Sequence, residues 1–145
     1  MGLPLNSGSS GKSRAGDSLA GRYFHYQLLP ISLSEIPKPK VSILSATEEV
    51  LDSMQSSIDA KEICELAEKE NFNADIFGPL AFDNSVSKKS ATIKGIKNEV
   101  AGDADVLLVP NVESGNALVK MMIYFMGACA AGVVVGGKVP VVITS

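Results

Sequence analysis

From residue 40 onward, short apolar runs alternate with longer segments of helical periodicity. Apolar runs bounded by turn residues are typical of strands, and apolar positions three and four apart are typical of amphipathic helices. Strands separated by helices predict an α/β fold whose mainly parallel sheet is covered by helices on both faces. The pattern predicts strands at 41–44, 75–77, 105–109, 132–135 and 139–144, helices beginning near 59 and spanning 87–94 and 117–129, and a short helix or turn at 47–54.

Capping signals mark the expected start of the first long helix. Asp59 as N-cap stands three residues before Glu62, and Ile58 can pack against Ile63 across the first turn. Such a start predicts one buried face on the helix that follows. The buried stripe is expected to consist of Ile63, Leu66 and Ala67.

Glycine and proline mark the expected ends of three other elements. Gly78-Pro79 is expected to stop the strand at 75–77, and Gly95 lies where a helix ending at Lys94 needs a left-handed residue. Residues 105–109 form the clearest candidate for a buried strand, and Pro110 ends it.

Residues 121–137 are the one candidate for a membrane span. These seventeen residues lack a charge but fall short of the roughly 18 to 20 that a spanning helix needs. Four glycines and a β-branched run at 133–135 favour the end of a buried helix, a turn and a strand. The N-terminus lacks a basic region followed by an apolar stretch, so we expect no signal peptide and no membrane partner. Two cysteines that suit reduced thiols predict a cytoplasmic location. The alternative is a small membrane protein that uses residues 118–137.

Composition narrows the chemistry that the chain can carry. One His in 145 residues leaves almost no material for a His-based metal site or a Ser-His-Asp triad within one subunit. Cys64 and Cys129 lack metal-ligand spacing, so we expect no metal and two reduced thiols buried as small apolar residues. A net charge of -3 argues against a strongly basic nucleic-acid module.

The charge is divided unevenly along the chain. Residues 1–40 carry five basic and two acidic residues, a balance of +3, whereas residues 41–145 carry eight Lys and fourteen acidic residues, a balance of -6. The first part opens with a Gly/Ser-rich stretch and closes with the Pro-punctuated segment 36–40, which is typical of a linker. We therefore place a boundary near residue 38, between a leader at 1–38 and a domain at 39–145.

Residues 109–116 form the first candidate binding segment, because ligands of open parallel sheets bind beyond the carboxyl ends of strands. Gly115 would let the backbone approach a ligand, and Asn111 and Asn116 can offer amide hydrogen bonds. Free N–H groups of the following helix can hold an anion. The alternative is a capped turn in which Asn111 and Asn116 satisfy local backbone groups.

Residues 78–84 form the second candidate segment. A rigid turn at Gly78-Pro79 followed by Asp83 and Asn84 can present two polar groups at a cleft. An Asx turn that starts the next helix is the alternative.

A set of short motifs occurs in a fixed order between residues 39 and 145. The motifs are Pro39-Lys40-Val41, Ile58-Asp59-Ala60, Gly78-Pro79-Leu80-Ala81-Phe82-Asp83-Asn84, Lys94-Gly95-Ile96, Val100-Ala101-Gly102-Asp103-Ala104-Asp105, Leu107-Leu108-Val109-Pro110-Asn111, Gly115-Asn116 and Val139-Pro140-Val141-Val142-Ile143-Thr144-Ser145. In these motifs, about three quarters of the chain resembles the phosphate acetyl/butyryl transferase family, nearer its butyryl branch. The resemblance implies the two-domain fold shared with isocitrate and isopropylmalate dehydrogenases. It also implies acyl transfer between coenzyme A and inorganic phosphate in the cleft between domains, without a separate cofactor.

The same resemblance implies features that this chain lacks. Family members continue past the serine that matches Ser145 with an arginine and then an acidic residue taken as the base for the coenzyme A thiol. They also carry a preceding domain whose arginines hold the phosphate, whereas this sequence has no Arg after Arg22. Ser145 would be the catalytic residue, orienting thiol or carbonyl. The substrate-binding residues would be Asn111, Gly115, Asn116, Gly78 and Asp83.

These differences predict a fragment of an acyltransferase that is inactive as given, with small-molecule substrates and self-association to a homo-oligomer as a possibility. The alternative is a non-catalytic interaction or assembly module that retains the fold.

The first forty residues are similar to a different family. Ser7-Gly8-Ser9-Ser10, the segment 16–23 and the segment 28–35 resemble the late part of an AAA+ type predicted ATPase, in which Arg22 would lie near the nucleotide. Gly11-Lys12-Ser13 is not a P-loop, because Asn6 stands where its first glycine is required. We therefore interpret the segment as a fused remnant that does not bind nucleotide, or as a basic leader whose aromatic residues pack on a neighbour.

Overall fold

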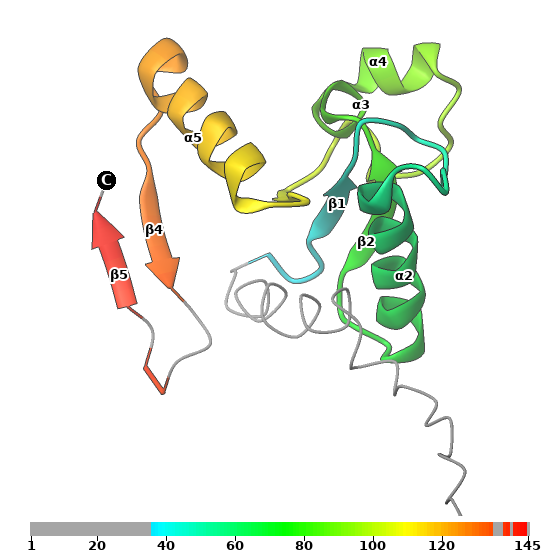
Figure 1. Ribbon diagram of the computed structural model, residues 1–145, viewed down its shortest axis with the longest axis horizontal. Helices are drawn as coiled ribbons and strands as arrows, with labels where there is room; N and C mark the ends of the chain where they lie inside the picture. The colour runs from blue at the N-terminus through cyan, green and yellow to red at the C-terminus, as the bar shows by residue number, and fades with distance from the viewer. Residues whose placement is uncertain (1–35, 135–137, 140, 145) are drawn as a thin grey trace, which may run out of the picture.

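A three-stranded parallel sheet is the centre of the computed structural model, which describes residues 36–134, 138–139 and 141–144 (Figure 1). Its strand order is β2-β1-β3, with both outer strands parallel to β1. The α/β class predicted from the pattern is therefore confirmed. The elements are β1 (Lys40–Leu44), α2 (Gln55–Lys69), β2 (Asp75–Leu80), α3 (Phe82–Val86), α4 (Lys88–Ile93), β3 (Val106–Leu108), α5 (Val112–Met126), β4 (Ala131–Val134) and β5 (Val141–Thr144).

The two faces of β1 pack against different helices, because side chains alternate along a strand. Val41 and Ile43 pack against α2, whereas Ser42 faces α3, where its hydroxyl lies 2.6 Å from that of Ser85. Helices thus lie on both sides of the central strand. The main core cluster includes the predicted stripe and consists of Val41, Ile43, Ala60, Ile63, Leu66, Ala67 and Leu108.

The amino end of β1 is tied to the start of β2 and to the segment before β3. Lys38 Nζ lies 2.5 Å from a carboxylate oxygen of Asp75, and the Asp75 N–H donates to the Pro39 carbonyl at 2.9 Å. On the other side, Lys40 Nζ contacts Asp103 at 2.7 Å, and the Lys40 N–H donates to Asp105 at 2.8 Å. Four short contacts therefore fix the position at which the chain enters the sheet.

The predicted start of α2 at Asp59 is wrong. The helix begins at Gln55, and Asp59 lies in its second turn, where it accepts a 2.8 Å hydrogen bond from Gln55 Nε2. The buried Ser57 hydroxyl organises the earlier start, since it accepts the Leu51 N–H at 2.9 Å and donates to the Met54 carbonyl at 2.7 Å. Residues 47–54 form turns, one of the two forms expected for them.

The predicted stop at Gly78-Pro79 is also wrong, because β2 runs through it to Leu80. The Gly78–Pro79 peptide bond is cis, and the pairing with β1 shifts register between Ser42 and Leu44. A side chain at position 78 would meet the Ile43 carbonyl oxygen at 2.7 Å, so the absent side chain lets the two strands approach closely.

The predicted helix at 87–94 is observed as α4, and a short α3 precedes it. The Ser87 hydroxyl caps α4 by accepting the Ser90 N–H at 3.2 Å, and Gly95 ends it with φ +72°, as predicted. Gly102 also has a positive φ, +78°, and its N–H donates to the Asn84 carbonyl at 2.7 Å. This bond joins the segment before β3 to α3.

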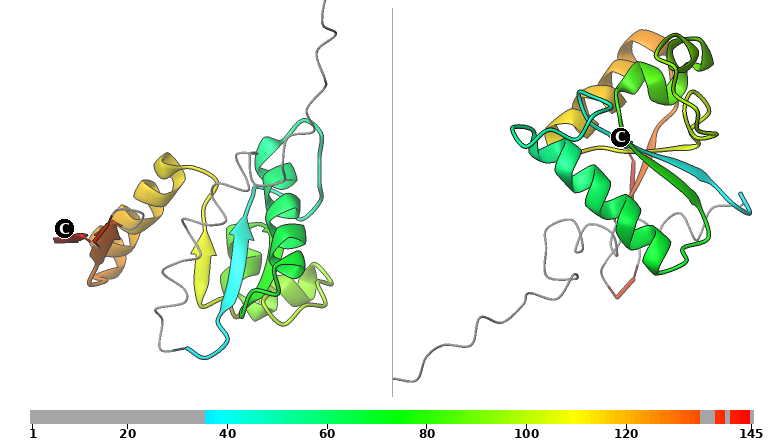
Figure 2. Two further views of the ribbon diagram at one scale, coloured as in Figure 1. Left: turned by 90° about the horizontal axis from the view of Figure 1, so that it is seen from below. Right: turned by 90° about the vertical axis from the view of Figure 1, so that its right-hand side faces the viewer.

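The C-terminal elements form an arm that extends away from the sheet (Figures 1 and 2). We call α5, β4 and β5 the arm. β4 and β5 pair antiparallel as a separate two-stranded hairpin, so neither adds to the parallel sheet. The expectation of a buried helix is wrong, because α5 has no buried residue. β3 is also less covered than expected, because Val106 and Leu107 are half-buried and only Leu108 of this strand is buried.

The open position of the arm also decides the environment of one cysteine. Both thiols are free, as expected, but Cys129 is exposed after the end of α5, which corrects the expectation that it is buried. Cys64 on α2 is half-buried, and burial raises the pKa of its thiol to about 11.

Within the described ranges, no helix is long and apolar enough to cross a membrane. Residues 1–35 of the predicted leader at 1–38, and Ser145, lie outside the described residues.

Substitution of Gly102 tests the junction between α3 and the segment before β3. A Cβ at Gly102 would lie 2.4 Å from the Lys88 nitrogen, whereas one at Gly95 would meet nothing within 4 Å. Both positions have left-handed backbone, so Gly95→Ala should cost about 1–2 kcal/mol and Gly102→Ala about 2–5 kcal/mol, since overpacking adds to the second. Urea unfolding of both variants measures the difference. Equal losses of stability would show that the contact with Lys88 relaxes freely.

Candidate functional site

The order of the strands defines where a ligand crevice forms. The chain leaves central β1 toward β2 on one side, and the later strand β3 lies on the other side. The loops that follow β1 and β3 therefore diverge at the carboxyl edge of the sheet, which is where open α/β sheets bind ligands. This edge carries the candidate functional site.

A small pocket lies at this divergence. Its volume is about 30 Å³, and we call it the edge pocket. Ser56 and Asp59 on α2 supply its only polar side chains among the described residues, and the Ser56 hydroxyl lies 2.9 Å from that of Ser45. The apolar lining comes from the ends of β1 and β3 and from α2, and consists of Ile43, Leu44, Ala60, Ile63, Leu108, Val109 and Pro110.

A polar network lies at the same edge, after β1 and β2. The fully buried Asn84 donates through Nδ2 to a carboxylate oxygen of Glu48. Lys94 Nζ lies 3.3 Å from the other oxygen of that carboxylate. Asn84 Oδ1 is buried without a hydrogen-bond partner within the described part of the chain. The network joins the loop after β1 to α3 and to the end of α4.

The environment of Glu48 favours its ionised form. Partial burial by itself would raise the pKa of the carboxyl group, but the hydrogen bonds from Lys94 and Asn84 outweigh burial and hold the pKa below its usual value. Glu48 is therefore set to accept hydrogen bonds as a carboxylate. A group with a lowered pKa is a weaker proton acceptor, so this geometry does not prepare Glu48 as a general base.

The first candidate segment is a helix start rather than a loop. Asn111 is the N-cap of α5, and its Oδ1 accepts the Ser114 N–H at 2.8 Å. The helix starts at Val112, five residues before the predicted start, so Gly115 and Asn116 lie inside it. A Cβ at Gly115 would meet a Val109 methyl group at 3.0 Å, so the glycine lets α5 pack against the end of β3. For Asn111, the capping alternative is confirmed.

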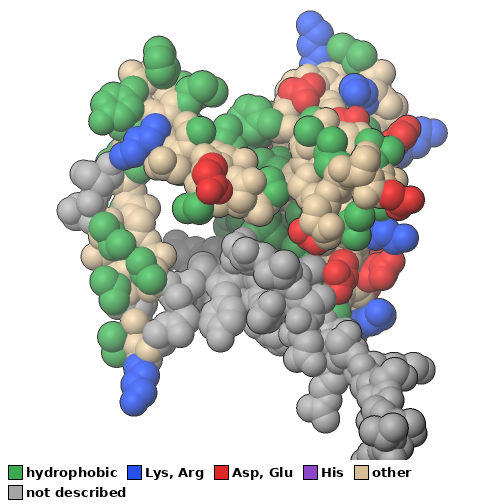
Figure 3. All heavy atoms as spheres, in the orientation of Figure 1, with side chains coloured by type: hydrophobic (Ala, Val, Ile, Leu, Met, Phe, Trp, Pro, Cys, Tyr) green, Lys and Arg blue, Asp and Glu red, His purple; other side chains and the backbone are tan. Residues whose placement is uncertain are grey.

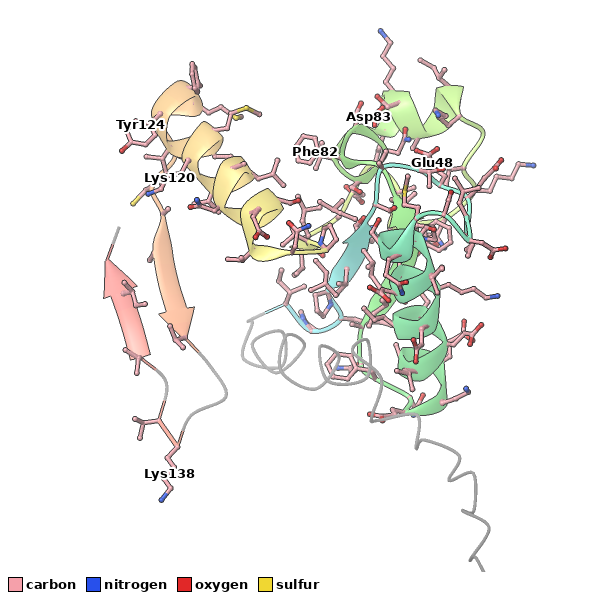
Figure 4. All side chains as sticks on the ribbon, in the orientation of Figure 1. Glu48, Phe82, Asp83, Lys120, Tyr124 and Lys138 are labelled. Carbon is pink, nitrogen blue, oxygen red and sulfur yellow. The ribbon has the colours of Figure 1, made fainter. Side chains whose placement is uncertain are left out.

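The second candidate segment divides into a strand and a helix. Gly78 lies inside β2, where it approaches β1, and Asp83 lies exposed in the first turn of α3. Figure 4 shows Asp83, Phe82 and Glu48 at the carboxyl end of β1, with Phe82 projecting to the side on which α5 lies. The structure thus brings Asp83 and Asn111 to the same edge of the sheet. The binding roles of these residues stay predictions, as does the role of Ser145.

The network partner Glu48 was missed by sequence reasoning. Glu48 and Asn84 are 36 residues apart, and an acidic residue in a turn is ordinarily solvated. The signal that could have found the pair is that residues following two neighbouring parallel strands meet at one edge. No group of three or more metal-binding side chains occurs within the described residues.

The fold and the site together define a class of protein. It is an α/β domain with a crevice at the carboxyl edge of a parallel sheet. Within that class, the family model "Phosphate acetyl/butaryl transferase" matches residues 32–145. The chain therefore belongs to the phosphate acetyl/butyryl transferase family, as the motifs predicted.

Curated relatives carry the same activity names. The chain is 45% identical over 109 residues to a phosphate acetyltransferase of Rhizobium meliloti, which covers 74% of this chain and 34% of the relative. It is 42% identical over 108 residues to a probable phosphate butyryltransferase of Bacillus subtilis, covering 74% and 36%. The chain thus spans about a third of the length of these relatives.

A solved structure agrees with the fold. The chain is similar to a branched-chain phosphotransacylase from Enterococcus faecalis, with a TM-score of 0.66 and 39% identity over 77% of this chain and 40% of the other. The AAA+ resemblance of the leader lies on residues outside the described ranges, and none of these similarities supports it, so it stays a prediction.

Replacing Glu48 with Gln tests the polar network through the pH dependence of stability. Because the folded pKa is lowered, the stabilisation is present above the unfolded pKa of about 4.3 and is lost as pH falls through the folded value. E48Q should cost about 1 kcal/mol or less at pH 7, as for partly exposed ion pairs, and the difference from wild type should shrink toward pH 3.

The measurement is urea unfolding of both proteins between pH 3 and 7. The Lys40 and Lys88 hydrogen bonds also lower the pKa of Asp103, but that residue is present in both proteins and cancels in the comparison. A stability difference that stays constant with pH would contradict the network.

Proposed function

We propose that this chain forms part of an acyltransferase that moves an acyl group between coenzyme A and inorganic phosphate. The observation that carries the proposal is spatial: within a chain of this family, the matched segments at 78–84 and 107–111 meet at the carboxyl edge of one sheet. That edge is the expected location of the substrate cleft. The proposal extends to the isocitrate dehydrogenase-like two-domain fold and to a cytoplasmic location.

The proposed roles follow from the chemistry of each group. The first-turn N–H groups of α5 can hold part of the anionic coenzyme A, with Asn111 fixing the start of that helix. Asp83 and the polar network bound the crevice on the β2 side. Ser145, outside the described residues, is proposed to orient the thiol or the carbonyl. Coenzyme A and acyl phosphate are substrates, and the proposal includes no resident cofactor.

The side chains that could bind a phosphate group limit the reaction that these 145 residues can carry out alone. The family-matched residues 32–145 contain neither Arg nor His, and Lys94 is already paired with Glu48. Transfer to or from an acyl phosphate needs cationic donors that hold the dianion as its charge develops. We therefore propose coenzyme A binding without efficient transfer.

Coenzyme A titration tests the binding step. In amide NMR spectra of the 145-residue chain, saturable shifts should appear at 111–114, the N-cap and first turn of α5, and at residues following β1. The matched variant N111A should weaken binding several-fold, because loss of the cap frays the first turn by about 1 kcal/mol. Shifts confined to other surfaces, or none up to millimolar coenzyme A, would overturn the proposed site.

Thioester formation tests the transfer step. With butyryl phosphate or acetyl phosphate and coenzyme A, absorbance of the thioester should not rise above a no-protein control. Residues 32–145 supply neither Arg nor His as donors to the phosphate, and loss of a single donor to a developing charge typically costs about 10²- to 10³-fold in rate. Clear turnover that S145A abolishes would show that the chemistry needs fewer groups than we propose.

A second candidate function is an assembly module, which the arm favours. Tyr124, Phe125 and Met126 are 77%, 87% and 74% exposed, and β4 and residues 141–143 of β5 are exposed as well. Figure 3 shows apolar side chains over this part of the surface, interrupted by few charges. An isolated two-stranded hairpin is marginal in water, so a second copy of the chain that covers the arm would stabilise both.

Sedimentation velocity tests this assembly. The wild-type chain should self-associate in a concentration-dependent way, and the double variant Y124S/F125S should weaken association at least tenfold, since buried aromatic residues dominate interface energies. The matched control I93S removes a side chain that is 76% exposed on α4, outside the arm. A wild-type monomer at all micromolar concentrations would contradict the assembly candidate.

A further inference from the structure

We propose that Asn84 and Lys94 form a binding site for the carboxylate of a small hydroxy acid, and that Glu48 occupies this site as an internal ligand. The proposal goes beyond acyl transfer, because it gives a chemical role to the polar network that does not involve coenzyme A. Its observations are the hold on both oxygens of Glu48, the burial of Asn84 and the unused acceptor of the Asn84 amide.

The carboxylate of Glu48 is held at each of its two oxygens. Asn84 Nδ2 donates to one oxygen, and Lys94 Nζ lies 3.3 Å from the other. Such charge-assisted contacts are among the stronger hydrogen bonds in proteins. The donors come from α3 and from the end of α4, whereas the carboxylate comes from the loop after β1. A carboxylate of another molecule can therefore replace the one that the loop supplies.

The buried donor is fixed in position by the backbone around it. Asn84 has 0% exposure, and its carbonyl accepts the Gly102 N–H at 2.7 Å. Ser85, the next residue, is also fully buried, and its N–H donates to the Ala81 carbonyl at 3.1 Å. A group that is already ordered loses little conformational freedom when a ligand binds to it. Asn84 is thus preorganised as a hydrogen-bonding group.

Glu48 satisfies only one half of the Asn84 amide. Asn84 Oδ1 is buried and, as far as the described residues reach, accepts no hydrogen bond. An ionised carboxylate has no proton to donate to this oxygen. A buried acceptor without a donor loses its hydration and gains nothing in return. The internal ligand is therefore incomplete, and a ligand with a hydroxyl beside its carboxylate fits the amide better.

An α-hydroxycarboxylate supplies both groups that the amide needs. One carboxylate oxygen accepts from Asn84 Nδ2, the hydroxyl donates to Asn84 Oδ1, and the second carboxylate oxygen faces Lys94. An Asn amide binds the edge of adenine through the same pairing of a donor beside an acceptor. Burial alone would raise the pKa of Glu48, yet its donors hold that pKa below its usual value, so these surroundings favour an anion over a neutral acid.

Displacement of Glu48 would also release the loop between β1 and α2. At one end of the loop, the Ser45 N–H donates to the Leu80 carbonyl at 2.9 Å, and at the other the Leu51 N–H donates to the Ser57 hydroxyl at 2.9 Å. Between these two anchors, Glu48 ties the loop to α3 and α4 at the carboxyl end of β1 (Figure 4). Glu48 therefore acts as an autoinhibitory contact that a hydroxy acid removes.

Two acids of equal size and charge test the need for a hydroxyl. Glycolate and propionate differ by a hydroxyl in place of a methyl group, and each is titrated into the full 145-residue chain at constant ionic strength. The side-chain amide signal of Asn84 is followed by NMR. We expect propionate to bind about five- to tenfold more weakly than glycolate, because only the hydroxyl satisfies Oδ1. Equal affinities of the two acids would overturn the proposal.

Removal of the internal ligand tests the competition. E48A should bind glycolate at least tenfold more tightly than wild type, since a tethered carboxylate competes at an effective concentration of roughly millimolar. If E48A does not fold, E48Q decides, because a neutral amide competes less well for Lys94. The matched control E49A removes an exposed carboxylate from the same loop and should keep the wild-type affinity. No gain in affinity, or no shift of the Asn84 signal, would overturn the proposal.

The second donor is tested by a variant that keeps most of its side chain. K94M should weaken glycolate binding at least tenfold, because a hydrogen bond to a charged group is lost. The matched control K89M removes an exposed charge from the same helix and should leave binding unchanged. Inorganic phosphate separates a carboxylate site from a general anion site. Phosphate that shifts the Asn84 signal with the affinity of glycolate would overturn the assignment to a hydroxy acid.

Discussion

The alternation of side chains along β1 is the constraint on which the structure depends. Val41 and Ile43 close the core against α2, while Ser42 on the other face meets Ser85 of α3. Because a shift by one residue would exchange these two sets, the strand has one register that satisfies both layers. The close approach of Gly78 to Ile43 then fixes β2 beside it. The geometry of the carboxyl edge, with its pocket and network, therefore depends on this single strand.

Local patterns predicted the features that depend on neighbouring residues. The stripe of α2 and the left-handed Gly95 follow from spacing within one turn or two, and both are observed. The start of α2 was missed because the buried Ser57 hydroxyl binds the preceding turn, a role that an exposed serine would not have. Capping residues are therefore weaker guides where a buried hydroxyl competes with them.

The arm and the network show the limit of sequence patterns. Apolar composition correctly predicted a helix and two strands in the arm, but burial requires a partner layer that composition alone does not supply. The contact of Glu48 with Asn84 joins residues that follow different strands, so it depends on the order of the strands in the sheet. The segment at 109–116 follows β3, and the cap at Asn111 was one of its two predicted forms, whereas the packing role of Gly115 depends on a tertiary contact with Val109.

The contacts at the amino end of β1 have a mechanical consequence. A tensile force applied to the segment that precedes the sheet acts first on Lys38 and Lys40. Asp75 holds Lys38 on one side, and Asp103 and Asp105 hold Lys40 on the other. Since β1 lies between two parallel strands, the load runs along the strand and is shared by both hydrogen-bonded ladders at once. The domain therefore resists tension from its amino side by shear across the sheet, and the antiparallel hairpin of the arm, which has a single ladder, yields first to a pull from the other side.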